Sequence, residues 1–551
     1  MLVIPFRPKL LECLHSYDRA TFFADLAAGV TVGVVALPLA IGFGIASGVT
    51  PAQGLWTAIV AGFLISLLGG SKVQVGGPTG AFVPLLAGIV VGYGYGGLAV
   101  ATLMAGVMLV LMGVFRLGNL IKFIPYPVTA GFTSGIAVII AVGQLKEFLG
   151  LEVVLPRHTP QQFWVVISNL ALTSLPTLAI GAIALLILLG WPKKWRYVPS
   201  SIVAVVVTTA AVAALGLNVQ TIGSKFGGIP RGLPELTMPK LTFEDFNHLL
   251  IPAFTIAMLG AIESLLSAIV ADGMIEDRHN SNQELIGQGL ANIVCPFVGG
   301  ISATGAIART ATNIRSGART PVAGIIHAMT LLVLMMLAAP LAKFIPLASL
   351  SAVLLIVAWR MGEWDTFIEL SHSTKSDFGV MLTTFALTVV FDLTVAVGAG
   401  LLMAAVLFIR RMEEITQIRL VTPKTDLEVG AGSIRDKQVP PGVLVYRIEG
   451  PFFFGAAEKL ENALARHSEV PKIVIFRMRN VPAVDATGLH ALEVVLEKFH
   501  RKGTQLLLSG VQPQPMKVLY KAGFVDKIGL DNICANLDVA LHRAHDILAP
   551  K

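Results

Sequence analysis

Apolar stretches about as long as a lipid bilayer is thick follow one another through residues 21–411. A helix needs about 20 apolar residues to cross the hydrocarbon core of a membrane. Two of the stretches, 77–92 and 302–318, are too short or too polar to cross alone. All the stretches together are residues 23–48, 52–69, 77–92, 96–115, 124–149, 175–191, 199–216, 249–272, 284–298, 302–318, 320–340, 344–359, 376–391 and 393–409. The sequence therefore predicts an α-helical polytopic membrane protein with about 14 transmembrane segments.

Charged residues are spread unevenly along the chain. Residues 1–411 hold 23 Lys/Arg and 18 Asp/Glu, and residues 412–551 hold 18 and 16. The whole chain is only 14% charged, whereas soluble proteins average about 25%. The sequence accordingly predicts four regions, namely a cytoplasmic N-terminal segment 1–20, a transmembrane domain 21–411, a linker 412–438 and a soluble domain 439–551.

Composition also excludes several classes of function. The net charge of +7 comes with no basic run interleaved with aromatic residues, so nucleic-acid binding is not expected. Cys13, Cys295 and Cys534 are far apart and fit no metal spacing or disulfide framework. The chain has no constellation of nucleophile, metal ligands or cofactor-binding residues, so the sequence predicts neither an enzyme nor a bound metal or cofactor.

The placement of Lys and Arg predicts the orientation in the membrane. With the N-terminus inside and an even number of spans, the inside loops carry 16 of these residues and the outside loops six. Cytoplasmic loops are enriched in Lys and Arg, so both termini are expected in the cytoplasm. Residues 1–19 lack an apolar signal core with a cleavage site. We therefore expect a multi-pass protein of the inner (plasma) membrane.

Two short motifs recur in the second half of the transmembrane domain. Lys122–Pro125 and Lys343–Pro346 share the sequence Lys-Phe-Ile-Pro, and Gly76–Gly80 resembles Gly299–Gly305. Either match could arise by chance, but both lie at corresponding positions of two seven-span halves. An odd number of spans per half makes two such repeats inverted in the membrane. The sequence thus predicts 7+7 inverted repeats.

Each half contains one short segment interrupted by Gly or Pro, and such broken helices mark binding sites near the midplane of the bilayer. A helix that begins inside the membrane leaves free N–H groups at its N-terminus, and these favour an anion. The residues at the two expected N-termini are Thr79, Gly80 and Ala81 in the first half, and Ala306, Ile307 and Ala308 in the second. The alternative is that the glycines serve only tight helix packing.

Arg309 follows the second N-terminus directly. A guanidinium at mid-membrane depth is costly and is a candidate functional residue by default. It could complete the positive field for an anion, or it could form a structural ion pair with Glu263. Arg315 and Arg319 lie nearer the cytoplasmic end and are expected to anchor the segment there.

Glu263 is a lone carboxylate in the middle of the eighth apolar segment. It could carry a proton together with the anion, or ligate Na⁺ with Ser267, which lies one helical turn away. A buried carboxylate satisfied by its neighbours is the alternative. Asp272 and Asp392 lie near span ends and are expected to be caps or interface residues.

The residues around the second broken helix resemble those of the SulP (SLC26) anion transporter family. The strongest match is Gly299–Thr310, followed by Thr312-Asn313 and Gly317–Gly324. Two further stretches, Gly77–Ala81 and Ala36–Ala40, are similar to other motifs of the family. The resemblance covers nearly the whole chain.

This resemblance implies a fourteen-span fold of two inverted repeats, divided into a core and a gate domain, and usually a homodimer. It also implies that the anion lies between half-helices 3 and 10, lined by Phe43, Thr79, Ala306, Ala308 and Arg309. Glu263 matches an acidic position associated with cation coupling, and a Glu there favours protons over Na⁺. Leu39, where many members have Gln, and the apolar Ala306 and Ala308 leave a less hydrated anion such as a dicarboxylate as an alternative to sulfate.

The soluble tail alternates strand-like and helix-like segments, which predicts an α/β domain. Strands are expected at 443–448, 472–477 and 505–509, and helices at 456–465 and 487–502. Val484–Gly488 is similar to the loop of STAS domains, in which a Ser or Thr can be phosphorylated. Thr487 occupies that place as a candidate regulatory residue, and Asp485 or Thr487 could instead cap the helix. The domain is expected to bind a cytoplasmic regulator.

The leading functional hypothesis is a secondary active, proton-coupled symporter of a small anion of the sulfate type. A bicarbonate or C4-dicarboxylate transporter coupled to H⁺ or Na⁺ is an alternative. An anion channel or sensor could use the same site without active transport. A nucleobase transporter is disfavoured by Arg309 and by the STAS-like tail.

Overall fold

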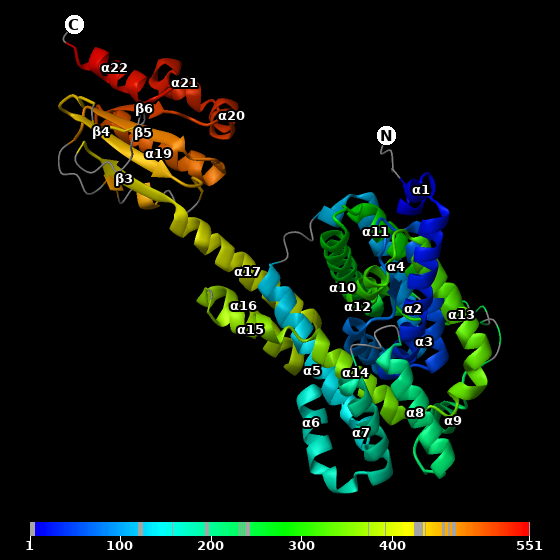
Figure 1. The fold of residues 1–551 in the computed structure, drawn as a ribbon. Helices are drawn as coiled ribbons and strands as arrows, with labels where there is room; N and C mark the ends of the chain where they lie inside the picture. Colours follow the sequence, from blue (N-terminus) through cyan, green and yellow to red (C-terminus); the bar gives the residue numbers. More distant parts are fainter. Residues whose placement is uncertain are drawn as a thin grey trace. The chain divides into compact units, whose positions relative to one another are not determined.

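The computed structural model forms two compact units, Met1–Leu402 and Met403–Lys551 (Figure 1). It describes residues 6–549 except 120–124, 157, 193–197, 231, 233, 235, 237, 239–242, 373, 392, 424–432, 436, 454–457, 461–462 and 465–469. Lys122, Phe123 and Ile124 of the predicted repeat, and Asp392, lie outside the described residues.

The first unit is helical, with two very short strands in its interior. Its elements are α1 (Lys9–Leu14), α2 (Arg19–Ala46), α3 (Pro51–Leu68), β1 (Gly76–Gly77), η1 (Gly80–Phe82), α4 (Val83–Val114), α5 (Tyr126–Leu149), α6 (Thr159–Ser168), η3 (Leu170–Leu172), α7 (Leu175–Gly190), α8 (Ser200–Leu215), α9 (Ile222–Phe226), α10 (Phe243–Ile275), α11 (Ser281–Val294), η5 (Cys295–Val298), β2 (Thr304–Gly305), α12 (Ile307–Arg315), α13 (Val322–Ala342), α14 (Leu347–Met361), α15 (Trp364–Ser371), α16 (Lys375–Val390) and the start of α17 (Leu393–Ile415).

Local sequence explains where the first long helices begin. The Asp18 carboxylate accepts a hydrogen bond from the Thr21 N–H and caps α2. Thr50 and Gln53 form a capping box at the start of α3, and Pro51 occupies its first turn. The interiors of both helices are apolar, so length and composition suit a bilayer rather than water.

Seven helices of the described part of the chain are long and apolar enough to cross a membrane. They are Arg19–Ala46, Pro51–Leu68, Gly80–Val114, Tyr126–Leu149, Phe246–Ile275, Val322–Ala342 and Leu347–Ser371. Two shorter apolar helices, Leu175–Gly190 and Ser200–Leu215, come in addition. The predicted fold class, a helical polytopic membrane protein with a C-terminal α/β domain, is confirmed. The number of 14 spans and the inverted repeat stay predictions.

Every one of the predicted apolar segments nevertheless contains a helix. The predicted break between segments 77–92 and 96–115 falls at Gly94, which leaves helical geometry with φ 67° and ψ −177° inside α4. Glycine adopts this positive φ without the steric cost that a side chain would bring. The other short segment, 302–318, contains only the nine residues of α12.

The helices of the first unit pack in two groups. In one, α13 packs on α2 and α3, while α4 packs on α10 and α11. In the other, α5 packs on α14 and α16, and α14 also packs on α7 (Figure 1). The family resemblance implied a core and a gate domain, and the assignment of these two groups to them stays a prediction. The two broken segments lie in the first group, and η1 contacts α5 of the second.

The second unit is built on a five-stranded sheet of β3 (Gln417–Val421), β4 (Val443–Glu449), β5 (Ile473–Asn480), β6 (Gln505–Ser509) and β7 (Ile533–Cys534), in the order β3-β4-β5-β6-β7. β3 pairs antiparallel with β4, and the other neighbours are parallel. Its helices include the end of α17, α19 (Ala486–Arg501), α20 (Pro513–Lys521), α21 (Phe524–Ile528), η6 (Leu530–Asn532) and α22 (Leu537–Leu548).

Both faces of this sheet are covered by helices. Phe476 faces a core that includes Leu492 of α19 and Phe524 of α21. Ile475, the next residue along β5, faces a second core that includes Ala540 of α22. Successive residues of a strand point to opposite faces, so a sheet buried on both sides reads as a continuous apolar run.

The three predicted strands and the helix expected at 487–502 are present within two or three residues of their expected bounds. The helix expected at 456–465 lies partly outside the described residues, and its described positions 458–460 and 463–464 are helical. Residues 412–438, expected as a linker, include the end of α17 and all of β3. β3 was not predicted because its place in the sheet depends on pairing with β4, about 25 residues later.

Candidate anion-binding site

The structure brings the two predicted broken helices together through a small sheet. β1 pairs antiparallel with β2, with Gly76 opposite Gly305 and Gly77 opposite Thr304. β1 leads into η1 and α4, and β2 leads into α12. The two helix N-termini therefore lie beside each other, although more than 220 residues separate them in the chain.

Close approach of a buried side chain explains a glycine in this sheet. A Cβ atom on Gly305 would overlap the side-chain amide of Gln74. That amide donates to the hydroxyl of Ser264 on α10. Glycine at this position therefore lets β2 pack against the buried Gln74–Ser264 hydrogen bond. This role differs from tight helix packing, the alternative considered from the sequence.

Neither helix N-terminus is capped by a side chain. The residues at the N-cap positions are Thr79 for η1 and Ala306 for α12, and neither makes a side-chain cap hydrogen bond. Thr79 is 7% exposed, and its hydroxyl has no hydrogen-bond partner among the described residues. Uncapped N–H groups and a free buried hydroxyl are donors that a ligand could satisfy.

Arg309 lies against the first broken helix and is almost completely buried. Its Nη1 donates to the Gly76 carbonyl at 3.4 Å and its Nη2 to the Pro78 carbonyl at 2.6 Å. No ion pair between Arg309 and a carboxylate is found within the described ranges, so the alternative of a structural ion pair with Glu263 is not observed. Carbonyls supply only partial negative charge, and the guanidinium keeps a net positive charge beside both N-termini.

Gly77 leaves room for that guanidinium. Its φ of +143° is rarely adopted by residues with a side chain, and a Cβ atom there would lie 2.5 Å from Arg309 Nη1. Strain of this kind costs about 1–3 kcal/mol. Gly77→Ala is therefore expected to lower thermal stability and to displace Arg309, with loss of any anion binding, as measured by a melting curve and a binding titration.

Gly143→Ala on α5 is the matched control, because a Cβ atom there would meet nothing within 4 Å. This control is expected to bind and melt like the wild type, since an Ala in a helix is tolerated at such a site. Equal behaviour of the two glycine variants would contradict the assigned role of Gly77.

Apolar side chains cover the first N-terminus. The Cβ position of Gly80 lies 3.2 Å from Ile140 Cδ1, 3.2 Å from Met361 Sδ and 3.4 Å from Phe43 Cε1. Phe43, on α2, is thus placed at the broken helix as the family resemblance implied. Ile140 on α5 and Met361 on α14 were missed, because no sequence motif marks residues that reach the site from the second helix group.

The remaining predicted lining residues differ in exposure. Ala81 is fully buried and Ala306 is 7% exposed. Ile307 is half-buried and Ala308 is exposed. The first turn of α12 therefore has one face in the protein interior and one face open. The binding roles of these residues stay predictions.

Glu263 and Ser267 lie on α10, next to the small sheet. Glu263 is 6% exposed, and no hydrogen bond to its carboxylate is found among the described residues. Ser267 is fully buried and donates to the Thr310 hydroxyl at 3.2 Å, which in turn accepts from the Val75 N–H. Ser267 thus ties α10 to α12 and to the chain entering β1, while Glu263 keeps its carboxylate available.

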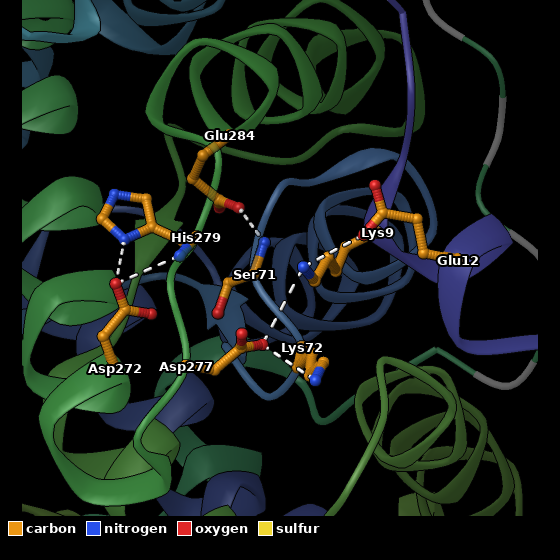
Figure 2. Close-up of polar contacts among 8 residues, drawn as sticks. All are labelled: Lys9, Glu12, Ser71, Lys72, Asp272, Asp277, His279 and Glu284. Carbon is orange, nitrogen blue, oxygen red and sulfur yellow. Dashed lines mark hydrogen bonds and ion pairs between the residues drawn. The ribbon is translucent and has the colours of Figure 1, made fainter. Parts of the chain in front are cut away.

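A polar cluster at one end of the first helix group holds the loop that leads into β1 (Figure 2). Glu284 of α11 accepts hydrogen bonds from the N–H groups of Gly70 and Ser71 at 2.7 and 3.1 Å. Asp277 pairs with Lys72 at 2.9 Å and with Lys9 at 3.8 Å. These contacts join α1, the loop before β1 and the loop before α11.

Asp272, predicted as a cap or interface residue, belongs to the same cluster. Its carboxylate accepts from the backbone N–H of His279 at 3.1 Å and lies 2.7 Å from the His279 Nδ1 (Figure 2). It therefore stabilises the turn between α10 and α11. No group of three or more His, Cys, Asp or Glu in the described part of the chain, this cluster included, could hold a metal ion.

In the second unit, Thr487 lies in the first turn of α19 and is exposed. The N-cap is Asp485, which accepts from the Gly488 N–H at 2.7 Å. Of the two capping residues considered from the sequence, the structure shows Asp485. Thr487 is free of that role, and its regulatory modification stays a prediction.

Comparison with known proteins decides the family. A model described as the sulfate permease family matches residues 22–384, and a STAS domain model matches residues 435–540. The chain belongs to the sulfate permease family. The predicted resemblance to SulP proteins is confirmed, and the chain is a multi-pass membrane transporter with a STAS domain rather than an enzyme.

Two relatives show how far the similarity extends within this family. The putative sulfate transporter YvdB of Bacillus subtilis strain 168 is 44% identical over 93% of this chain and 96% of its own. The bicarbonate transporter BicA of Picosynechococcus is 32% identical over 94% of both chains. Members of the sulfate permease family with different named substrates thus align with nearly the whole protein.

Solved structures confirm the fold. That of SLC26A9 superposes with a TM-score of 0.87 at 17% identity, covering 98% of this chain and 92% of that one. The transmembrane domain of a cyanobacterial BicA superposes with a TM-score of 0.62 at 32% identity, covering 71% of this chain and 98% of that domain.

Proposed function

We propose that this sulfate permease family member is a proton-coupled symporter of a small inorganic anion of the sulfate type. The anion binds between the N-termini of η1 and α12. The observation that carries this proposal is the buried, positively charged Arg309 beside two uncapped helix N-termini. A positive charge buried inside a membrane is costly and marks a functional site by default.

The donors at the site match the chemistry of an oxyanion. Backbone N–H groups at helix N-termini bind anions through hydrogen bonds and the helix dipole. The free hydroxyl of Thr79 adds a further donor, and Arg309 adds a full charge. Arg also presents donors in a planar fork that fits two oxygens of one anion.

Proton coupling rests on Glu263. A carboxylate in the membrane interior with no hydrogen-bond partner among the described residues is stable chiefly when it holds a proton. Uptake of a proton from one side and its release on the other can then accompany the anion. Na⁺ is the alternative coupling ion, with Glu263 and Ser267 as oxygen ligands.

Bicarbonate is the second candidate substrate. BicA proteins from two cyanobacteria are 32% and 34% identical to this chain over at least 90% of its length. The 44% identity to a putative sulfate transporter ranks sulfate first. Bicarbonate carries a smaller charge than sulfate and would suit a site with a single guanidinium. C4-dicarboxylates are the third anion to test.

Proteoliposome uptake separates these functions. Reconstituted protein is expected to accumulate labelled sulfate when the outside is acidic, and to show no such accumulation with a Na⁺ gradient alone. Each coupled proton allows about tenfold more accumulation per pH unit, because one unit corresponds to about 1.4 kcal/mol. Labelled bicarbonate and fumarate are measured in the same vesicles, and empty vesicles serve as the control.

Several outcomes would contradict the proposal. Accumulation of bicarbonate but not of sulfate would assign the second candidate, and dependence on a Na⁺ gradient would replace the proton as coupling ion. Downhill flux that ignores both gradients would indicate a channel. Saturable anion binding without any flux would indicate a sensor.

The same proposal includes location and partners. Both termini lie in the cytoplasm of a cell whose plasma membrane holds the protein, and the transporter works as a homodimer. The STAS domain then faces the cytoplasm, where the exposed Thr487 is accessible to a regulatory protein or kinase.

A further inference from the structure

His327 is a buried titratable residue that has no role in the anion binding or proton coupling proposed above. It lies on α13 and is 0% exposed. Neither Nδ1 nor Nε2 forms a hydrogen bond of ordinary geometry within the described part of the chain, although the Gly324 backbone lies near enough to interact with the ring. Buried polar atoms are almost always paired, so such a group calls for an explanation. Neither nitrogen is therefore held by a well-formed hydrogen bond to the described residues.

The imidazole of His327 lies close to β1, the strand that leads into the first broken helix. A Cβ atom on Gly62 of α3 would lie 3.4 Å from His327 Nδ1 and Cε1, and 3.3 Å from the Gly76 carbonyl oxygen. The Nη1 of Arg309 donates to the same carbonyl. The ring and the guanidinium are therefore neighbours of one backbone carbonyl of β1, and they interact electrostatically.

The groups that face His327 are otherwise neutral. α2 contributes Gly33, which packs on the His327 carbonyl, and α3 contributes Gly62. Ser66, one turn after Gly62, lies against Gly324, and its hydroxyl is also buried and unpartnered among the described residues. Arg309 of α12 is the charged group that interacts with the ring. No carboxylate acts on His327 within the described ranges.

This arrangement links a proton on His327 to an anion at Arg309. Two positive charges close together in a low-dielectric interior repel each other strongly. An anion held by Arg309 and the helix ends cancels that repulsion. Binding of the anion therefore favours binding of the proton, and by thermodynamic reciprocity the proton favours the anion.

We propose that His327 takes up a proton when the anion binds beside Arg309, and is a second proton-coupling residue in addition to Glu263. The inference rests on the proposed anion site, and it adds a second coupled proton to the one assigned to Glu263. The proton passes from water to one imidazole nitrogen and returns to water when the anion leaves. No other bond forms or breaks.

Proton uptake on anion binding tests this role. Titration calorimetry of the full-length protein with sulfate, in two buffers of different ionisation enthalpy, gives the number of protons taken up per anion. His327→Gln is expected to take up fewer protons than the wild type, by up to one per anion. Its affinity should also rise less steeply on acidification, since each linked proton changes affinity by up to about tenfold per pH unit.

Control variants separate this role from a structural one. His248→Gln removes an exposed imidazole on α10 and should leave the proton count unchanged. His327→Asn replaces His327→Gln if a melting curve shows that the first variant is unfolded. Glu263→Gln, measured in parallel, should reduce the count independently of His327.

An unchanged proton count in folded His327→Gln or His327→Asn would overturn the inference. So would wild-type protein that binds sulfate without proton uptake. If the wild type binds no sulfate, bicarbonate or fumarate, the proposed anion site itself fails, and the inference fails with it.

Discussion

Replacing Arg309 with alanine is expected to weaken anion binding about 10- to 100-fold. A hydrogen bond to a charged group contributes about 1.5–3 kcal/mol. This variant removes the full positive charge of Arg309 beside the two helix N-termini. A binding titration on purified protein measures the loss directly. Uptake into proteoliposomes should fall in parallel, because occupancy of the site falls.

Two variants keep that result interpretable. Arg315→Ala, at the last residue of the same helix, removes an exposed guanidinium and should bind like the wild type. Arg309→Lys keeps the charge but loses the planar fork that reaches two carbonyls, so it should recover only part of the affinity. Wild-type affinity in a folded Arg309→Ala variant would assign this residue to structure alone.

Replacing Glu263 with glutamine is expected to reduce accumulation driven by a pH gradient about tenfold per pH unit. The amide keeps the size of the side chain but cannot bind and release a proton, so uptake should depend less steeply on external acidification. The wild type should gain about tenfold accumulation per pH unit for each coupled proton, and the variant should lose the share that Glu263 carries. Labelled-sulfate uptake at a series of external pH values provides the measurement.

Exchange of labelled for unlabelled anion at equal pH distinguishes lost coupling from a lost site. This exchange needs no net proton movement, so Glu263→Gln should retain it. Glu276→Gln, an exposed carboxylate just after α10, serves as the matched control and should keep full gradient dependence. Undiminished gradient dependence in Glu263→Gln would remove the coupling role from this residue.

The helical membrane fold could be predicted because its cause lies in the local sequence. Water is absent from the bilayer core, so each apolar stretch must satisfy its own backbone by forming a helix. The break at Gly94 and the short α12 could also be predicted from the local sequence, because Gly and Pro interrupt the apolar pattern. In the tail, apolar runs marked β4, β5 and β6 but not β3, whose pairing is not local.

The candidate site was predicted in part. The residues at the helix N-termini and Arg309 could be named because Gly, Pro and Arg are conspicuous in an apolar background. Their partners could not be named from the sequence. The carbonyls that hold Arg309, the apolar cover from Ile140 and Met361, and the imidazole of His327 behind β1 depend on which helices pack together.

The sequence by itself determined that this protein is a helical membrane protein with an α/β tail and two broken helices. Those properties follow from hydrophobic periods and from residue types with strong local preferences. Only the tertiary structure decided that β1 and β2 pair, that Arg309 lacks a carboxylate partner among the described residues, and that His327 lies near it. Distance in space depends on the packing of segments more than 200 residues apart, and no local preference encodes that distance.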